Sequence, residues 1–205
     1  MQIVKDKFKL SKPIKPSKLS AEDIQKITDT LTTELEKHGG IGLSANQLGL
    51  DVRACIIKVI DPLVLINPTI IERSEDAVAY VEQCLSIDKT LKSPVKTVRS
   101  KRILVETDNL GIVEFKADNQ FNDWKDADEF FGDTGLMECV VAQHEIDHLD
   151  GILITDISRK YSTTYVAPKS YGRNEMVMVK LSDGKTEFMK YKKAQKFLEL
   201  GAEIV

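Results

Sequence analysis

The chain has 205 residues, of which 42% are hydrophobic and 30% charged, and its formal net charge is −3. This length allows one sizeable core with a small appendage, and the weak negative charge does not indicate a general nucleic-acid binder. No apolar run approaches the ~20 residues of a membrane span, and the lysine-rich N-terminus lacks the apolar stretch of a secretory signal. The three unevenly spaced cysteines do not suggest a disulfide framework, so we expect a cytoplasmic protein.

The first regular element that the sequence predicts is a helix that begins after Ser20. Ser20 can cap this helix and Asp23 occupies the acidic position of a capping box. Apolar residues then recur at helical spacing up to about Lys37, and Gly39 and Gly40 end the pattern.

A glycine-rich segment follows at residues 39–49. It matches neither a Walker loop nor a dinucleotide-binding fingerprint, so it predicts only a tight turn where small residues let the backbone approach a ligand. Gln47 adds chemical interest, because a carboxamide N–H can stabilise a developing oxyanion.

The middle of the chain predicts strands. Residues 52–59 and 63–66 read as two of them, and residues 101–107 and 112–117 flank an Asp-Asn-Leu-Gly turn and predict a β-hairpin. An acidic and aromatic segment at 118–133 is expected to be a long loop before a late helix. Strands followed by a central helix indicate the α+β class, with antiparallel sheet packed on that helix.

The late helix carries Gln-His-Glu-Ile-Asp-His at residues 143–148. The four-residue spacing places His144 and His148 on one face, and Glu145 is turned about 100° from His144. Two imidazoles suit a transition metal, and the glutamate can move protons on a water beside it. A surface helix could match so short a pattern by chance, but the surrounding apolar stripe places the histidines on the buried side.

A catalytic metal usually has three protein ligands and one open position, so a third ligand is needed. Cys55 lies inside an apolar strand, and Cys139 is turned about 140° from His144, so both favour core packing. Cys84 remains, near the end of an expected strand, either as a metal ligand or as a nucleophile paired with a histidine.

The sequence changes character after about residue 165. Residues 176–181 and 185–190 predict a second hairpin, and residues 191–200 predict a short helix. The segment is basic through Lys180, Lys185, Lys190, Lys192, Lys193 and Lys196. We therefore divide the chain into a main domain, 1–165, and a basic extension, 166–205, whose lysines form either a solvated face or a docking surface.

Three segments taken together resemble the motifs of the peptide deformylase family. Residues 40–47 match Gly-x-Gly-x-Ala-Ala-x-Gln, except that Ser44 replaces the first alanine. Residues 82–86 match Glu-Gly-Cys-Leu-Ser, except that Gln83 replaces the glycine, and residues 143–148 match Gln-His-Glu-x-Asp-His in full. The order and approximate spacing of the three motifs also agree with the family.

The resemblance covers roughly residues 10–160 and implies a deformylase-like fold in the main domain, with removal of the N-formyl group from N-formylmethionyl polypeptides and release of formate. It implies Cys84, His144 and His148 as ligands of one divalent metal, Fe²⁺ as the native ion and Zn²⁺, Ni²⁺ or Co²⁺ as substitutes. A thiolate and two imidazoles accept several such metals. The expected partners are nascent formyl-Met chains and, through the basic extension, the ribosome; no membrane and no specific nucleic acid is expected.

The resemblance also implies roles for individual residues. Glu145 is expected to pass a proton from water to the leaving amine, while the Gln47 side chain and the Leu85 N–H receive the oxyanion. Substrate contacts around a methionine pocket are expected at Ile41, Gly42, Gln83, Arg99, Met137, Val140 and Val141. Core packing is the alternative for the apolar members of this set, and Glu82 and Asp147 are expected either beside the site's polar groups or in a structural salt bridge.

Two other functions fit parts of the sequence. An H-E-x-x-H endopeptidase needs a further ligand downstream, but no histidine follows His148 and the nearest glutamate, Glu175, lies in a Gly/Asn-containing loop. A non-catalytic binding protein on the same fold is consistent with Gln83, whereas intact Glu145 and Gln47 favour an enzyme.

Overall fold

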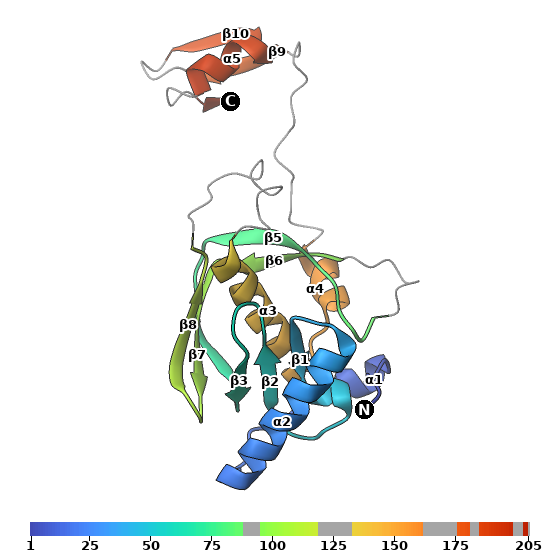
Figure 1. The fold of residues 1–205 in the computed structure, drawn as a ribbon. Coiled ribbons are helices and arrows are strands. Elements are labelled where there is room, and N and C mark those ends of the chain that lie inside the picture. Colours follow the sequence, from blue (N-terminus) through green and yellow to red (C-terminus); the bar gives the residue numbers. More distant parts are fainter. Residues whose placement is uncertain (88–94, 119–132, 162–175, 181–184, 199–202, 205) are drawn as a thin grey trace. The chain divides into compact units, whose positions relative to one another are not determined.

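The computed structural model describes residues 1–87, 95–118, 133–161, 176–180, 185–198 and 203–204 (Figure 1). The chain divides into two compact units, Met1–Thr163 and Thr164–Val205. The described helices of the first unit are α1 (Lys7–Leu10), α2 (Ala21–His38), the 3₁₀ helix η1 (Ala45–Leu48), α3 (Thr134–Leu149) and α4 (Ile154–Tyr161). Its described strands are β1 (Gly42–Ser44), β2 (Ala54–Ile57), β3 (Leu63–Ile66), β4 (Thr69–Arg73), β5 (Ala77–Glu82), β6 (Val95–Ser100), β7 (Arg102–Thr107) and β8 (Gly111–Lys116).

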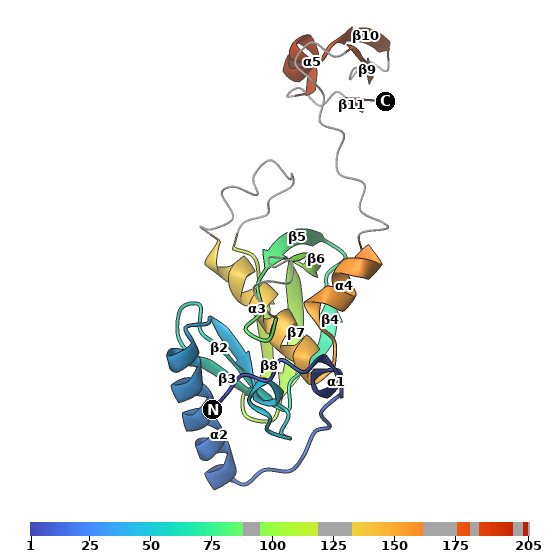
Figure 2. The ribbon, with the colours of Figure 1, turned by 90° about the vertical axis from the view of Figure 1, so that its right-hand side faces the viewer.

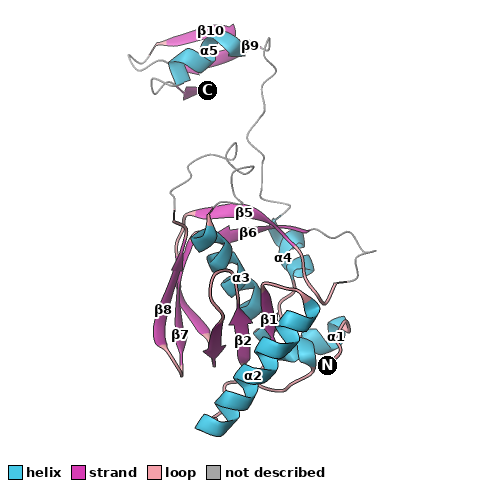
Figure 3. Cartoon of the chain, in the orientation of Figure 1, coloured by secondary structure: helices cyan, strands magenta, loops and turns pink. Residues whose placement is uncertain are grey.

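These strands form three antiparallel sheets, ordered β1-β2-β3, β4-β7-β8 and β5-β6. The sheets surround α3, the helix that carries residues 143–148 (Figure 3). The predicted α+β class, with antiparallel sheets around a central helix, is therefore confirmed.

The capping signals at α2 are confirmed. Ser20 Oγ accepts a hydrogen bond from the Asp23 N–H (3.1 Å), and Asp23 Oδ2 accepts one from the Ser20 N–H (3.1 Å). At the other end Gly39 adopts the left-handed conformation, with φ of 72°, so the chain can leave the helix there. The 101–117 hairpin is also confirmed as β7 and β8, whereas β4, β6 and α4 were not predicted.

Strand β2 is covered on both faces, and this places α3 in the core. Ala54 and Ile56 share an apolar cluster with Leu31 of α2. Cys55 and Ile57 share another cluster with residues of α3, β7 and β8. Helices α2 and α3 therefore lie on opposite sides of this sheet (Figure 2), and a strand covered in this way reads as a continuous apolar run.

Helix α3 begins at a strong cap and is buried along most of its length. Asp133 Oδ1 accepts a hydrogen bond from the Leu136 N–H (2.8 Å), and Gly151 follows the helix with φ of 73°. All six residues of the 143–148 segment are buried. Each polar side chain there consequently needs a partner other than water.

The second unit contains β9 (Met176–Lys180), β10 (Thr186–Lys190), α5 (Tyr191–Leu198) and β11 (Glu203–Ile204), with strand order β10-β9-β11. Val177, Val179, Met189 and Ala194 form its buried cluster, and the second hairpin and the following helix are confirmed. The expected turn at 182–184 and most of the expected 118–133 loop lie outside the described residues. Among the described helices, none is long and apolar enough to cross a bilayer.

Candidate active site

A cleft of about 760 Å³ opens beside α3, a size typical of small-ligand sites. Three segments supply most of its walls: residues 39–42, residues 80–85, and Met137, Val140, Val141, His144 and Glu145 of α3. Lys5, His38, Gln47 and Ile87 complete the lining. The three motifs, which are far apart in sequence, therefore meet at one cavity.

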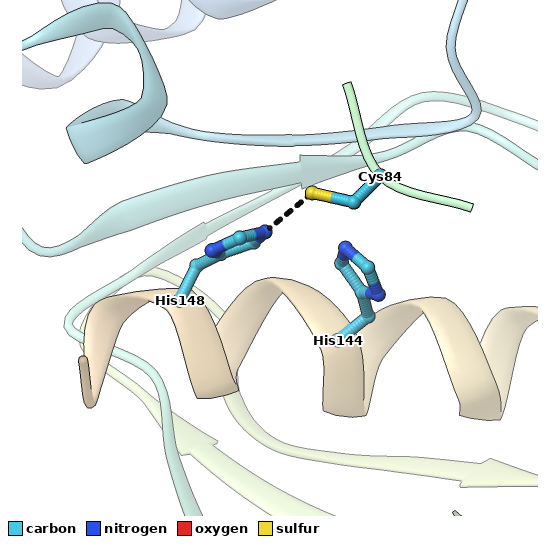
Figure 4. Close-up of side chains that lie close together, drawn as sticks. All are labelled: Cys84, His144 and His148. Atoms are coloured by element: carbon cyan, nitrogen blue, oxygen red, sulfur yellow. Dashed lines mark hydrogen bonds between the residues drawn. The ribbon is translucent and has the colours of Figure 1, made fainter. Parts of the chain in front are cut away.

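Cys84, His144 and His148 lie close together (Figure 4), and Cys84 and His144 line the cleft. One donor atom from each of the three side chains lies within 4.8 Å of the other two, and Cys84 Sγ is 3.2 Å from His148 Nε2. The histidines come from successive turns of α3, and Cys84 follows the end of β5. The spacing and donor types fit one shared divalent ion, and Cys55 and Cys139 are buried elsewhere in the core.

A buried ionic network holds one of the histidines. His144 Nδ1 lies 2.6 Å from Glu82 Oε2, and Arg99 donates to the same carboxylate through Nε (2.6 Å) and Nη2 (3.0 Å). Arg99 also forms an ion pair with Asp147. Although burial opposes it, the hydrogen bond from His144 and the charge of Arg99 lower the pKa of Glu82 to about 2. An ionised Glu82 fixes the His144 tautomer and leaves Nε2 of that ring as the donor atom for a metal.

The expectation that Arg99 contacts substrate is corrected by this network. Its side chain is only 3% exposed and does not line the cleft. Both of its carboxylate partners, Glu82 and Asp147, are buried as well, so the guanidinium is committed to them.

Glu145 lies against β1 at the edge of the cleft and is 4% exposed. Its Oε2 atom is buried and has no hydrogen-bond partner among the described residues. Burial raises the pKa of Glu145 to about 7, although the nearby charge of His144 acts in the opposite direction. A Cβ atom on Gly42 would lie 2.5 Å from Glu145 Oε1, so a side chain at this position would displace the Glu145 carboxyl.

Gln47 presents its amide N–H group to the thiol side of the site. Nε2 donates to Ser86 Oγ (3.1 Å) and lies 3.6 Å from Cys84 Sγ. Its Oε1 accepts hydrogen bonds from Ser44, through the backbone N–H (2.9 Å) and the hydroxyl (3.0 Å). The glycine-rich segment is thus a strand followed by a 3₁₀ turn that carries Gln47 to the site.

The other expected substrate residues occupy different parts of the cleft. Ile41 and Gln83 are exposed at its rim, whereas Val140 and Val141 are buried in its wall. Met137 is partly buried and packs on the main apolar cluster, and Leu85 and Gly42 also line the cavity.

Sequence reasoning missed several lining residues, among them Tyr80, Lys5 and His38. Tyr80 precedes Glu82 by two residues on β5, so strand periodicity places both side chains on one face and could have indicated it. Lys5 and His38 come from segments outside the motifs, and their sequence context carries no such signal.

An open cleft with a Cys-His-His cluster and a buried glutamate beside it defines a metal-dependent hydrolase. The model of the polypeptide deformylase family matches residues 1–163. The peptide deformylase of Alkalilimnicola ehrlichii is 34% identical over 141 residues, which cover 66% of this chain and 68% of the relative. That of Dictyoglomus thermophilum is 36% identical over 136 residues, covering 66% and 76%.

Solved structures agree with these sequence comparisons. Peptide deformylase from Thermotoga maritima superposes with a TM-score of 0.58 at 27% identity, covering 76% of this chain and 95% of the other. A variant of Arabidopsis thaliana peptide deformylase 1B gives 0.61 at 25% identity, covering 77% and 80%. The chain belongs to the peptide deformylase family.

Membership makes the chain an enzyme that removes the N-formyl group from nascent polypeptides, rather than an endopeptidase or a non-catalytic binding protein. The family is metal-dependent, in agreement with the Cys-His-His cluster. The family match ends at residue 163, where the first compact unit also ends.

Proposed function

We propose that Cys84, His144 and His148 hold one ferrous ion, beside which Glu145, Gln47 and the Leu85 N–H carry out deformylation. The observation that carries this proposal is the convergence of the three donors beside an open cleft, with Glu82 oriented to hold one of the imidazoles. When bound there, a divalent metal acts as a Lewis acid and makes water nucleophilic near neutral pH.

Glu145 is the group proposed to move protons. Its buried Oε2 has no partner within the described part of the chain, so it can accept a proton from the attacking water. The same carboxyl then delivers this proton to the nitrogen of the leaving amine, which departs poorly without it. Burial supports both steps, because a pKa raised toward 7 lets the group bind and release a proton near neutrality.

Gln47 and Leu85 are proposed to receive the negative charge that develops on the formyl oxygen. The Gln47 amide is already oriented, because its oxygen is held by Ser44 and its nitrogen lies on the Cys84 side. Leu85 directly follows Cys84 and lines the same cleft. Donors fixed in advance stabilise such charge without reorganisation during the reaction.

The apolar wall of the cleft is proposed to bind the methionine side chain of the substrate. Met137, Val140 and Val141 supply this wall from α3, and Ile41 stands at the rim with 47% exposure. Among the described strands β1 pairs only with β2, so Gly42 on the other edge of β1 can hydrogen-bond an extended peptide. Gln83, at the position of the family's glycine, is proposed to narrow the entrance for the residues that follow methionine.

Formate release from formyl-Met-Ala-Ser tests the catalytic assignment. We expect turnover by the wild-type chain and a loss of about 10²- to 10⁴-fold in Glu145→Ala. Metal per chain and thermal stability should remain near wild type in this variant, because Glu145 is not among the three donors. Activity that survives Glu145→Ala, or cleavage of internal peptide bonds, would contradict the proposal.

Metal analysis of anaerobically purified protein tests the ion. We expect about one iron per chain and activity that falls in air, because thiolate and ferrous iron both oxidise. Cys84→Ser should lower iron content, whereas Cys139→Ser, at a buried cysteine outside the cluster, should not. Full activity in air with iron still bound would count against ferrous iron as the native metal.

The second unit is proposed to bring the enzyme to ribosomes, in the compartment where formyl-methionyl chains are made. Its described lysines, Lys180, Lys185, Lys190, Lys192 and Lys193, are exposed and fit a polyanionic surface. Co-sedimentation with ribosomes should weaken as salt rises and when these lysines are changed to glutamate. Formate release from a short peptide should stay unchanged, and sedimentation that is indifferent to both changes would exclude this role.

A further inference from the structure

Ser44 departs from the family motif at a position next to the catalytic groups. The motif has alanine there, whereas this chain has a hydroxyl that is completely buried. Buried hydroxyls need partners, and this one donates to Gln47 Oε1 at 3.0 Å. Ser44 is also on the same strand face as Gly42, whose missing side chain makes room for Glu145.

The contacts of Ser44 bear on which end of the Gln47 amide, the oxygen or the nitrogen, faces the reacting formyl group. A carboxamide can rotate by half a turn, exchanging its acceptor oxygen and its donor nitrogen. Two donors converge on Oε1, the backbone N–H of Ser44 at 2.9 Å and the hydroxyl at 3.0 Å. Rotation would bring the amide N–H₂ against the backbone N–H, so the present orientation, with Nε2 toward Cys84, is favoured.

We infer that Ser44 is a positioning residue that locks the Gln47 amide with its N–H₂ group toward the reacting formyl oxygen. Alanine at this position leaves one donor on Oε1, and serine adds a second. The inference rests on the oxyanion role proposed for Gln47. It assigns to the Ser44 hydroxyl a contribution to catalysis that passes through another side chain rather than through substrate.

The principal variant is Ser44→Ala, which installs the residue of the family motif and so is expected to fold. Losing one hydrogen bond to the amide should lower kcat about 3- to 10-fold. KM should be nearly unchanged, because the interaction matters most when charge develops. Ser44→Cys keeps a similar volume with a weak donor and should resemble alanine more than serine.

Controls separate positioning from a purely structural role. Rates are normalised to metal per chain and compared with Ser74→Ala, which removes a hydroxyl bonded to Asp76 O, outside the residues that line the cleft. We expect Ser74→Ala to keep wild-type kcat. A purely structural effect of Ser44→Ala would lower metal content or thermal stability and leave kcat per bound metal unchanged, and that result would overturn the inference.

A double-mutant cycle supplies the decisive comparison. The Ser44 hydroxyl also contacts the Glu145 carboxyl, so it could act through either neighbour. If it acts through Gln47, Ser44→Ala should cost less than about 1.5-fold in a Gln47→Ala background. A full effect in that background would overturn the inference and leave the role of Gln47 intact. A Gln47→Ala variant with wild-type kcat would instead refute the oxyanion assignment itself, and the inference with it.

Discussion

Helices α2 and α3 have similar lengths, 18 and 16 residues, but meet opposite requirements. Helix α2 buries an apolar stripe that includes Leu31 and Leu35 and leaves most of its polar side chains in water. Helix α3 is central, and its polar segment 143–148 is buried with the rest. A surface helix needs only an apolar stripe on the side that packs against the protein. A buried helix with polar residues needs a hydrogen-bond or ionic partner for each polar group.

The partners of α3 come from several strands. Gln143 Oε1 accepts from Arg73 Nη1 (2.9 Å) and from the Ser100 N–H (3.1 Å), and Asp147 pairs with Arg99. Among the described residues, the buried side-chain atoms of α3 without a partner are Glu145 Oε2 and His148 Nδ1. Both atoms lie on active-site residues, so the buried polar atoms of this helix that lack a hydrogen-bond partner are found at the active site.

The largest expected loss of stability comes from breaking the buried ionic network around Arg99. Arg99→Met leaves Glu82 and Asp147 buried without their cation, and we expect a loss of about 3–5 kcal/mol in unfolding free energy. Urea denaturation measures this change. The matched change on α2, Lys26→Met, breaks an exposed pair with Glu22 and should cost less than about 0.5 kcal/mol. Equal losses of unfolding free energy in the two variants would contradict this difference between the two helices.

The next effect concerns the apolar stripe of α2. Leu35 is 1% exposed, and Leu35→Ala should cost about 3 kcal/mol through lost burial and the cavity that remains. The Leu35 side chain does not line the cleft, so formate release per folded molecule should stay near that of wild type at a temperature where the variant is folded. A proportionate fall in kcat would show that α2 does more than cover the sheet.

A change at the contact between β1 and α3 is expected to affect stability less and enzyme activity more. In Gly42→Ala the added carbon would meet Glu145 Oε1 at 2.5 Å and Val141 Cγ1 at 2.6 Å, so the carboxyl must move. We expect kcat/KM to fall about 10- to 100-fold, because catalysis tolerates small displacements poorly. The thermal midpoint should change by only a few degrees, and wild-type kinetics would show that Glu145 can adapt.

The smallest effect is at the start of α2. Ser20→Ala removes the cap that accepts the Asp23 N–H and should cost about 1 kcal/mol. Thermal unfolding followed by circular dichroism detects a loss of this size, and enzyme activity should not change. A loss comparable to that of Leu35→Ala would mean that this helix depends on its terminus as much as on its core.

The sequence predicted those features that depend on local pattern. The cap at Ser20, the β7–β8 hairpin and the spacing of His144 and His148 follow from turn chemistry and periodicity. Strand β6 was missed because its inward positions are Thr97 and Arg99, which reverses the usual apolar signal.

The role of Arg99 was misjudged for a related reason. Its carboxylate partners, Glu82 and Asp147, lie 17 and 48 residues away in sequence. Periodicity within one segment carries no information about which distant side chains will meet. The cysteine ligand, Cys84, was identified by elimination and by the family motif rather than by any local pattern.

One feature of β5 links metal binding to folding. Glu82, which orients His144, and Cys84, which contacts His148, leave the same strand end two residues apart. With an ion bound, this strand end is therefore tethered to α3 both through Glu82 and through Cys84. Occupancy of the metal site and order of the strand end are then thermodynamically linked. Each tenfold rise in free metal above its dissociation constant adds about 1.4 kcal/mol against opening of this strand end, so metal supply itself sets how often the site comes apart.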